Sequence, residues 1–362
     1  MYPRETQLSQ WLSTLFPKQT LSLQPLAGDA SFRRYYRCYH PDGTYIVMDA
    51  PPEKDASCIP FSILSKALRE KNINAPQIHH ANFELGFLLL DDFGDTTYLE
   101  ALKTENPQIL YQQAIQTLIK IQHCHDINTT DFELPFFNAH FMATELENFD
   151  RWFIDELLGL SLNRSQRKIL DDAYEHLLQS AVYQPQVVIH RDYHSRNLMF
   201  TPQNSPGVLD FQDAMIGPIT YDLVSLLKDC YINWPESLVS TWVDYYFNEA
   251  KAGGLIDNQM TETQFSHAFD LMGIQRHLKA IFIFSRLHVK YERSSYLNDI
   301  PRTLQYIVTA TGRYEEFEPL HWLLQTLISP KFSYPEPRSF RREMTPRTTV
   351  ASLNSLSAEE KI

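Results

Sequence analysis

The stretch VIHRDYHSRNLMF, residues 188–200, decides the fold, because it sets charged and amide side chains between two short apolar runs. A loop that only turned the chain would use Gly, Pro or Asn-Gly. This loop instead carries an imidazole, a guanidinium, a carboxylate and an amide: His190, Arg191, Asp192 and Asn197. The apolar flanks are typical of short buried strands. The stretch therefore predicts a polar functional loop held between strands.

The chain returns to this loop through a second turn. TPQNSPG, residues 201–207, is rich in turn residues, and Val208 and Leu209 lead from it to Asp210. A hairpin of this kind would bring Asp192, Asn197 and Asp210 together. A carboxylate can accept a hydroxyl proton, and amide and carboxylate oxygens are ligands suited to Mg²⁺. We therefore predict phosphoryl transfer, with Asp192 as catalytic base and Asn197 and Asp210 as metal ligands.

Composition limits the classes of function. The chain has 362 residues, of which 43% are hydrophobic, so it can bury a sizeable core. Its formal net charge of -12 argues against nucleic acid as a partner. The four cysteines form no C-x-x-C pair, which favours a reducing cytoplasm over zinc or disulfide chemistry. We find no targeting or membrane signal and expect a cytoplasmic protein that is monomeric.

The pattern along the chain predicts two lobes and a tail. Residues 1–91 read as a short helix, antiparallel strands joined at HPDGT, and a second helix. Residues 92–330 are mainly helical by their three- and four-residue apolar spacing, interrupted by short strands near 187–211. Residues 331–362 turn polar and are expected to be disordered. The fold class is therefore α+β, with a small sheet lobe and a large helical lobe.

The motif H-R-D-x-x-x-x-N followed by Asp-Phe resembles the catalytic and metal-binding loops of kinase-like folds. Only a short segment follows the Asp-Phe pair, without an A-P-E signature, which favours the aminoglycoside and choline phosphotransferase family over protein kinases. Further blocks, AGDASFRRYYR, GFLLLDDFGD and MGIQRHLKAIFIFSRL, resemble the bacterial anomeric sugar kinases of cell-wall recycling. The resemblance implies a two-lobed protein-kinase-like fold, ATP and Mg²⁺ as cofactors, and N-acetylmuramate and N-acetylglucosamine as substrates.

The expected ATP site lies in the first lobe. Gly28 would permit a tight turn, with the amides of Asp29, Ala30 and Ser31 facing phosphate oxygens, although an ordinary hairpin would look similar. The hinge near Asp91 and Phe93 would bind adenine through backbone groups. The third strand, YIVMDAP, departs from the kinase pattern because it lacks the phosphate-binding lysine. Arg33, Arg34 or Lys54 are candidates to replace it, unless these side chains are merely solvated.

Six further residues are candidates for substrate contact or for support of the catalytic loop: His190, Arg196, Asp213, Asp222, Arg276 and Lys279. His190, like Arg191, is expected to act as scaffold. Asp213 could hold a second ion, pair with Arg196, or form a turn. Asp222 could cap its own helix or brace the catalytic loop. Arg276 and Lys279 could meet a substrate anion or only extend from a buried helix towards water.

The leading hypothesis is an ATP-dependent kinase that phosphorylates the anomeric hydroxyl of an amino sugar. A kinase of another small alcohol, such as an aminoglycoside, choline or homoserine, is the alternative among enzymes. The basic segment QRHLK disfavours the cationic ones of these substrates. A catalytically inactive nucleotide-binding pseudokinase is the alternative of a different class, because the strand lysine is absent.

Overall fold

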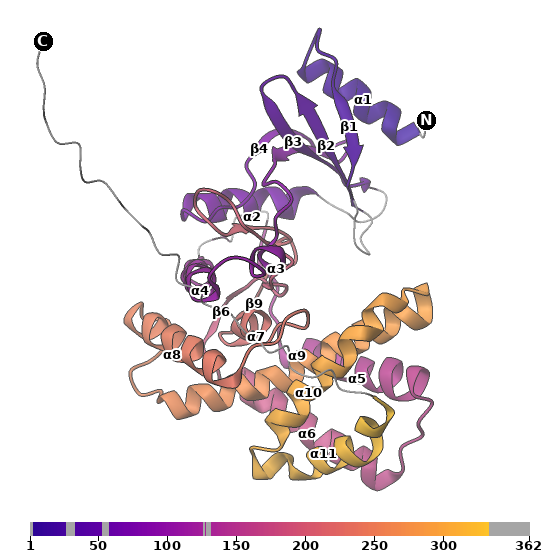
Figure 1. Ribbon diagram of the computed structural model, residues 1–362, viewed down its shortest axis with the longest axis vertical. Coiled ribbons are helices and arrows are strands. Elements are labelled where there is room, and N and C mark those ends of the chain that lie inside the picture. Colours follow the sequence, from indigo (N-terminus) through magenta and orange to yellow (C-terminus); the bar gives the residue numbers. More distant parts are fainter. Residues whose placement is uncertain (1–2, 27–32, 53–57, 126, 128–131, 333–362) are drawn as a thin grey trace, which may run out of the picture.

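The computed structural model describes residues 3–26, 33–52, 58–125, 127 and 132–332. These residues form two lobes, a sheet lobe drawn at the top of Figure 1 and a larger helical lobe below it. The predicted α+β kinase-like architecture is confirmed. Gly28, Asp29, Ala30, Ser31, Lys54 and nearly all of the predicted tail lie outside the described residues.

The N-lobe is built on a five-stranded antiparallel sheet in the order β1-β2-β3-β5-β4. Its strands are β1 (Ser22–Pro25), β2 (Arg34–His40), β3 (Gly43–Asp49), β4 (Ile78–Asn82) and β5 (Phe87–Asp91). The predicted HPDGT hairpin joins β2 to β3, with His40 opposite Gly43. Gly43 has a φ of 147°, which L-residues rarely adopt. The turn therefore fixes the register of the central hairpin.

One helix covers each face of the sheet. Helix α1 (Pro3–Leu15) packs Leu8 and Leu12 against Val47 and Leu89, whereas α2 (Cys58–Glu70) packs against the opposite face. Side chains alternate between faces along a strand. Residues 46, 48, 88 and 90 therefore turn towards α2 and the cleft, and residues 47, 49, 87 and 89 turn towards α1. This alternation decides which strand side chains reach a ligand.

The C-lobe contains the remaining helices and two short hairpins. Its helices are α3 (Tyr98–Ala101), α4 (Pro107–Gln122), α5 (Ala139–Phe149), α6 (Arg164–Val182), α7 (Tyr221–Leu227), α8 (Glu236–Ala252), α9 (Glu262–Tyr291), α10 (Ile300–Thr311) and α11 (Glu318–Leu323). Helix α9 runs through the lobe and is buried over most of its length (Figure 1). A capping box of Thr261 and Gln264 starts it, so its register against the site is well defined.

Two expected helices differ in detail. The apolar pattern predicts one helix over 143–159, but the structure has α5 followed by a π-helical segment, Asp150–Leu157. The helix expected over 221–232 stops at Leu227, because the following residues bind the catalytic loop. The lobe boundary at 91/92 stays a prediction, although β5 ends at Asp91. Among the described residues, no helix is both long and apolar enough to cross a bilayer.

Candidate active site

The loop 190–197 connects two small hairpins. Strand β6 (Gln186–Ile189) pairs with β9 (Met215–Pro218), and β7 (Leu198–Met199) pairs with β8 (Gly207–Val208). The Asn197 side-chain amide donates to the Asp192 carbonyl at 3.0 Å and lies 3.4 Å from Asp210 Oδ2. The three residues predicted to act together are therefore adjacent. Asp210 has a φ of 63°, so the backbone itself turns at this point.

His190 supports this loop from behind. Its Nε2 lies 2.9 Å from the Leu209 carbonyl, and its Nδ1 lies 3.3 Å from the Asp192 backbone nitrogen. A carbonyl only accepts and an N–H only donates, so this geometry fits the neutral tautomer protonated at Nε2. The ring thus connects the backbone beside Asp192 to the backbone beside Asp210. This position agrees with the expected scaffold role.

Asp222 braces the same loop. Its carboxylate, on α7, accepts hydrogen bonds from the backbone N–H groups of His190 at 2.6 Å and Arg191 at 2.9 Å. Arg191 has a φ of 76°, a left-handed conformation that costs free energy in an L-residue. Of the two roles expected for Asp222, the geometry corresponds to bracing the loop, because its carboxylate accepts from the loop backbone and α7 has no side-chain cap hydrogen bond.

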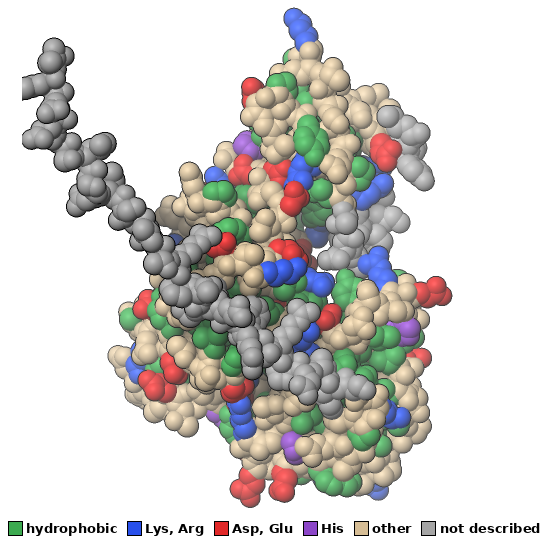
Figure 2. Space-filling model, in the orientation of Figure 1, with side chains coloured by type: hydrophobic (Ala, Val, Ile, Leu, Met, Phe, Trp, Pro, Cys, Tyr) green, Lys and Arg blue, Asp and Glu red, His purple; other side chains and the backbone are tan. Residues whose placement is uncertain are grey.

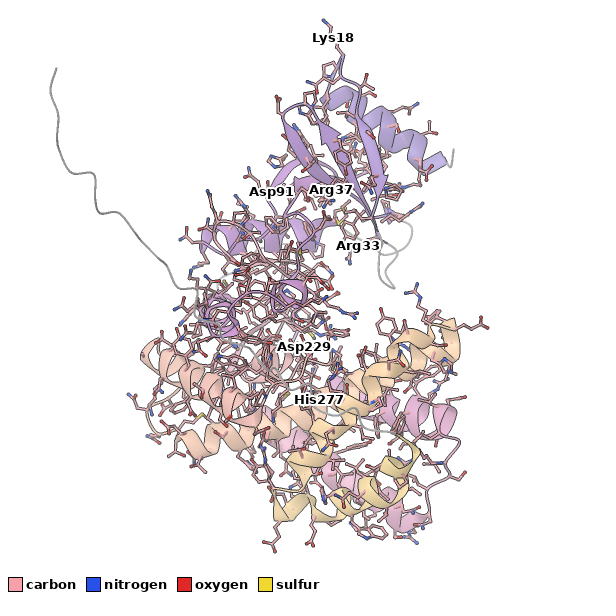
Figure 3. The ribbon with its side chains drawn as sticks, viewed as in Figure 1. Lys18, Arg33, Arg37, Asp91, Asp229 and His277 are labelled. Atoms are coloured by element: carbon pink, nitrogen blue, oxygen red, sulfur yellow. The ribbon has the colours of Figure 1, made fainter. Side chains whose placement is uncertain are left out.

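Asp229 is a second brace, which the sequence reading missed. Its Oδ2 accepts from the Ser195 backbone N–H at 3.0 Å and from the Ser195 hydroxyl at 2.5 Å, while Oδ1 accepts from the Tyr231 N–H at 2.9 Å. Figure 3 labels Asp229 within the helical lobe. Because 34 residues separate Ser195 from Asp229, no local pattern signals this contact.

Basic side chains of α9 surround Asp192. Burial would raise the pKa of Asp192, but the nearby positive charges, that of Lys279 above all, outweigh burial and lower this pKa to about 2. Arg276 donates to the Ser225 hydroxyl, and Lys279 donates to the Tyr221 hydroxyl at 2.8 Å. Asp192, Arg276 and Lys279 share a small cavity of about 110 Å³. The structure therefore brings both predicted basic residues to the catalytic carboxylate.

Glu145 compensates part of this positive charge. Its Oε1 lies 3.5 Å from Lys279 Nζ and 3.6 Å from Arg191 Nη2, and its Oε2 accepts from Gln275 at 3.0 Å. Glu145 is on α5, more than 40 residues before the catalytic loop, and sequence reasoning did not single it out. Glu145 lowers the free-energy cost of burying Arg191 and Lys279 beside the site, because an unpaired buried charge is costly.

The donor set at Asn197 and Asp210 fits Mg²⁺. The Asn197 amide nitrogen is used within the loop, which leaves its Oδ1 for a metal, and Asp210 Oδ1 accepts from Gln212 at 2.7 Å. Among the described residues no group of three or more His, Cys, Asp or Glu side chains is arranged for a metal ion. Mg²⁺ commonly uses one or two protein ligands together with phosphate oxygens. Two oxygen donors beside a nucleotide cleft match that pattern.

A cleft of about 410 Å³ lies between the lobes at this point. Lys and Arg side chains lie beside acidic ones along the hollow between the lobes in Figure 2. The cleft joins the underside of the N-lobe sheet to the metal-ligand pair. Its lining includes Arg33, Tyr35, Ile46, Asp91, Phe93, Asn197 and Asp210. The predicted hinge residues and the predicted metal ligands therefore face one cavity.

The two candidate arginines differ in position. Arg33 lines the cleft, and Figure 3 shows it at the lower edge of the N-lobe, facing the gap between the lobes. Arg34 is one residue along and on the other face, where its Nε lies 3.6 Å from Asp49 Oδ2. Arg4 of α1 also binds Asp49, at 2.5 Å. The structure thus brings Arg33 to the cleft and keeps Arg34 with Asp49.

Met48 and Asp49 occupy the part of the third strand in which the kinase pattern has its lysine. Met48 turns towards α2 and is fully buried among apolar side chains. Its neighbour Asp49 faces α1. Neither residue carries a positive charge, so the cation that binds phosphate must come from another residue.

The hinge contains another ion pair that the sequence reading missed. Arg37 donates to both carboxylate oxygens of Asp92, at 2.7 and 3.1 Å, and also reaches Asp95 at 2.8 Å. Burial would raise the pKa of Asp92, but hydrogen bonds from Arg37 and from the Gly94 backbone lower it. Asp91 points elsewhere and accepts from His79 at 2.8 Å. Both carboxylates are thus engaged in ion pairs, and adenine recognition by the backbone of residues 91–93 stays a prediction.

Arg196 and Asp213 do not meet. The Arg196 guanidinium lies over the Tyr231 ring, 3.6 Å from its centroid. Asp213 is exposed and lines a separate cavity of about 780 Å³. The alternative in which these two form an ion pair is wrong. The possible metal role of Asp213 stays a prediction.

Comparison with known proteins identifies the family. The model of the phosphotransferase enzyme family, APH, matches residues 22–255. The chain belongs to this family. The N-acetylmuramate/N-acetylglucosamine kinase of Neisseria meningitidis serogroup B is 39% identical over 330 residues, covering 90% of this chain and 96% of that protein. The protein of the same name from Pseudomonas putida is 39% identical over 306 residues, covering 84% of this chain and 88% of that one.

Solved structures agree on the fold of this phosphotransferase. The ADP-bound aminoglycoside phosphotransferase APH(2'')-Ib has a TM-score of 0.55 at 17% identity, covering 83% of this chain and 97% of that chain. Choline kinase LicA from Streptococcus pneumoniae has a TM-score of 0.58 at 14% identity, covering 84% and 99%. At these identities the likeness concerns the fold alone. The family resemblance found in the sequence is confirmed.

Proposed function

We propose that this phosphotransferase is an ATP- and Mg²⁺-dependent kinase that phosphorylates the anomeric hydroxyl of N-acetylmuramate and N-acetylglucosamine. The observation that carries the proposal is the adjacency of Asp192, Asn197 and Asp210 between a nucleotide-sized cleft and an acceptor cavity. The choice of sugar is supported by the relatives, two N-acetylmuramate/N-acetylglucosamine kinases that match this chain over 90% and 84% of its length. On the same basis we propose a role in peptidoglycan recycling, and we propose a cytoplasmic location from the cysteine usage of the sequence.

In this proposal the N-lobe cleft holds ATP. Backbone groups of residues 91–93 bind adenine, and the Phe93 ring forms part of the pocket wall. The Arg33 guanidinium reaches the phosphates in place of the strand lysine. Asn197 and Asp210 hold Mg²⁺, which would neutralise charge on the transferred phosphoryl group.

Asp192 orients the acceptor hydroxyl and takes its proton. With a pKa of about 2 it is ionised at neutral pH and is a weak base. A weak base suits phosphoryl transfer through a loose transition state, in which the hydroxyl proton leaves late. An anomeric hydroxyl is also more acidic than an ordinary alcohol, which reduces the demand on the base. Arg276 and Lys279, beside Asp192, disfavour cationic acceptors such as choline or aminoglycosides.

A panel of acceptors tests this function. The purified protein is incubated with ATP, Mg²⁺ and one of N-acetylmuramate, N-acetylglucosamine, choline, homoserine or kanamycin, and the product is identified by ³¹P NMR. We expect an anomeric phosphate with the two amino sugars and no product with the others. If only choline or kanamycin is phosphorylated, the protein is a kinase of another small alcohol and the proposed substrate is wrong. ATP binding without any product would identify a pseudokinase and contradict the proposal.

A further inference from the structure

We propose that Arg286 binds the carboxylate of the acceptor sugar and makes the enzyme prefer N-acetylmuramate to N-acetylglucosamine. N-acetylmuramate is N-acetylglucosamine with a lactyl ether, so the two substrates differ by one carboxylate-bearing group. The inference rests on the proposed function and assigns a specificity residue within it.

The acceptor cavity is larger than an unsubstituted sugar needs. It has a volume of about 780 Å³ and shares no lining residue with the nucleotide cleft. Arg191 and Lys279 line its inner end, next to the catalytic loop, and Arg286 lines it two helical turns further along α9. Phe136 and Phe282 supply apolar wall between polar groups. Such a cavity has room for a sugar and a charged substituent.

Of the three cations Arg191, Lys279 and Arg286 that line this cavity, the first two share one acid and Arg286 has no paired acid among the described residues. Glu145 lies within 3.6 Å of both Arg191 and Lys279, so its single negative charge offsets one of these two positive charges. Among the described residues, no carboxylate lies within 4.0 Å of the Arg286 side-chain nitrogens, and its buried Nε has no hydrogen-bond partner. Asp213 is the other acid that lines the cavity, and it is exposed. A buried guanidinium N–H without a partner is costly, so an anionic ligand would satisfy it.

The direction of the side chain supports the same assignment. Long side chains on a helix lean towards its N-terminus. Arg286 therefore leans back along α9 towards Lys279, the residue that dominates the electrostatic field at Asp192. The phenyl ring of Phe282, one turn earlier, lies 5.8 Å from the guanidinium carbon and limits where it can move. A sugar whose hydroxyl is held at Asp192 can present a ring substituent to this guanidinium.

The test is the ratio of kcat/KM for N-acetylmuramate to kcat/KM for N-acetylglucosamine. For Arg286→Gln we expect kcat/KM for N-acetylmuramate to fall about tenfold or more, the usual effect of losing a charge-assisted hydrogen bond, with N-acetylglucosamine changed less than about twofold. Arg286→Lys should recover part of the ratio. Lys290→Gln removes the same charge one turn further along α9, at an exposed position outside the cavity lining, and should leave the ratio unchanged.

The outcomes separate this inference from the proposed function. If Arg286→Gln lowers both sugars equally, or neither, or if Lys290→Gln lowers the ratio as much, the carboxylate assignment is wrong while the kinase function stands. Wild-type protein that phosphorylates neither sugar overturns the function and this inference with it. Thermal unfolding of each variant accompanies the kinetics. Should Arg286→Gln not fold, Arg286→Met, which keeps much of the length of the side chain without its charge, takes its place, and a ratio unchanged from wild type in that variant would overturn the inference.

Discussion

Asp192 and Asp222 are neighbouring carboxylates whose pKa values move in opposite directions. Burial dominates at Asp222 and raises its pKa, even though two backbone N–H groups bind it. At Asp192 burial acts in the same sense, but the charge of Lys279 and its neighbours reverses the shift. Asp192, the proposed catalytic base, is thus kept ionised by charges of α9, whereas Asp222, which braces the loop, is held by hydrogen bonds.

The adjacent arginines Arg33 and Arg34 give a matched pair of variants. We expect Arg33→Ala to raise KM for ATP about tenfold, because its side chain lines the cleft and would lose a phosphate contact. Arg34→Ala should leave KM for ATP within about twofold, because Arg34 faces Asp49. Steady-state kinetics with varied ATP checks both. Equal effects of the two substitutions on KM for ATP would contradict the conclusion that Arg33 faces the cleft and Arg34 faces away from it.

At the scale of elements, the β7–β8 hairpin presses against the hinge. A Cβ added at Gly207 would lie 2.7 Å from Phe93 Cδ2, closer than atoms can approach. The hairpin thus needs glycine so that Phe93 can form the wall of the nucleotide cleft. The sequence signalled the turn around Gly207, but the contact across 114 positions carried no local signal.

We therefore expect Gly207→Ala to weaken nucleotide binding. The added methyl displaces Phe93, so the dissociation constant for ATP should rise about tenfold, the order expected when overpacking costs 1–2 kcal/mol. Fluorescence titration with a labelled ATP analogue measures it. Gly254→Ala serves as control for the substitution type, because nothing lies within 4 Å of a Cβ there, although its φ of 79° adds backbone strain. Unchanged ATP affinity in Gly207→Ala would disprove the contact.

Helix α9 is also anchored by a buried ion network away from the site. Asp270 accepts from Lys228 at 2.7 Å, from Arg313 at 2.8 Å and from the Tyr314 hydroxyl at 2.8 Å. Burial would raise the pKa of Asp270, but Lys228 and Arg313 lower it below its ordinary value of 3.8. Asp270 therefore stabilises the fold above about pH 4, and this contribution is lost as the pH falls through the lowered pKa.

Asp270→Asn should lower the free energy of unfolding by about 3 kcal/mol at pH 7, because it leaves Lys228 buried without its counter-charge. The difference from wild type should stay constant between pH 5 and 8. It should shrink as the pH falls below about 3.8, where the carboxyl of the unfolded chain takes up a proton, and it should be lost once the folded carboxyl is protonated at its lowered pKa. Urea unfolding at several pH values measures it.

Asp172→Asn is the matched control, since its pair with Lys168 is exposed on α6 and its loss should leave the free energy of unfolding nearly unchanged. If the difference in the free energy of unfolding between Asp270→Asn and wild type does not depend on pH, the pKa of Asp270 is not lowered in the folded protein.

At the scale of the whole molecule, the sequence predicted what is local. The catalytic loop, its hairpin and the central N-lobe strands each carry their own apolar and turn patterns, so Asp192, Asn197 and Asp210 could be placed together beforehand. The braces from Asp229 and Glu145 could not, because Asp229, in the segment after α7, and Glu145, on α5, lie 34 and 46 residues from their partners in the chain. Which of Arg33 and Arg34 faces the cleft could likewise not be predicted, because it depends on the strand register.

The two lobes matter because neither contains the complete site. The N-lobe contributes Arg33 and the hinge, the C-lobe contributes the catalytic loop, and the cleft of about 410 Å³ joins them. Helix α9 then supplies the charges that act on Asp192 and line the acceptor cavity. The whole arrangement delivers a nucleotide phosphate from one lobe to an acceptor hydroxyl held by the other.

The most direct test is the turnover of Asp192→Asn, measured together with its ATP affinity in the presence of Mg²⁺. Asn keeps the size of the side chain but cannot take the hydroxyl proton. We predict that kcat with N-acetylmuramate falls about a thousandfold, within the usual contribution of a general base, while the dissociation constant for ATP stays within about twofold of wild type. Turnover within tenfold of wild type would contradict the assignment of Asp192 as the catalytic base.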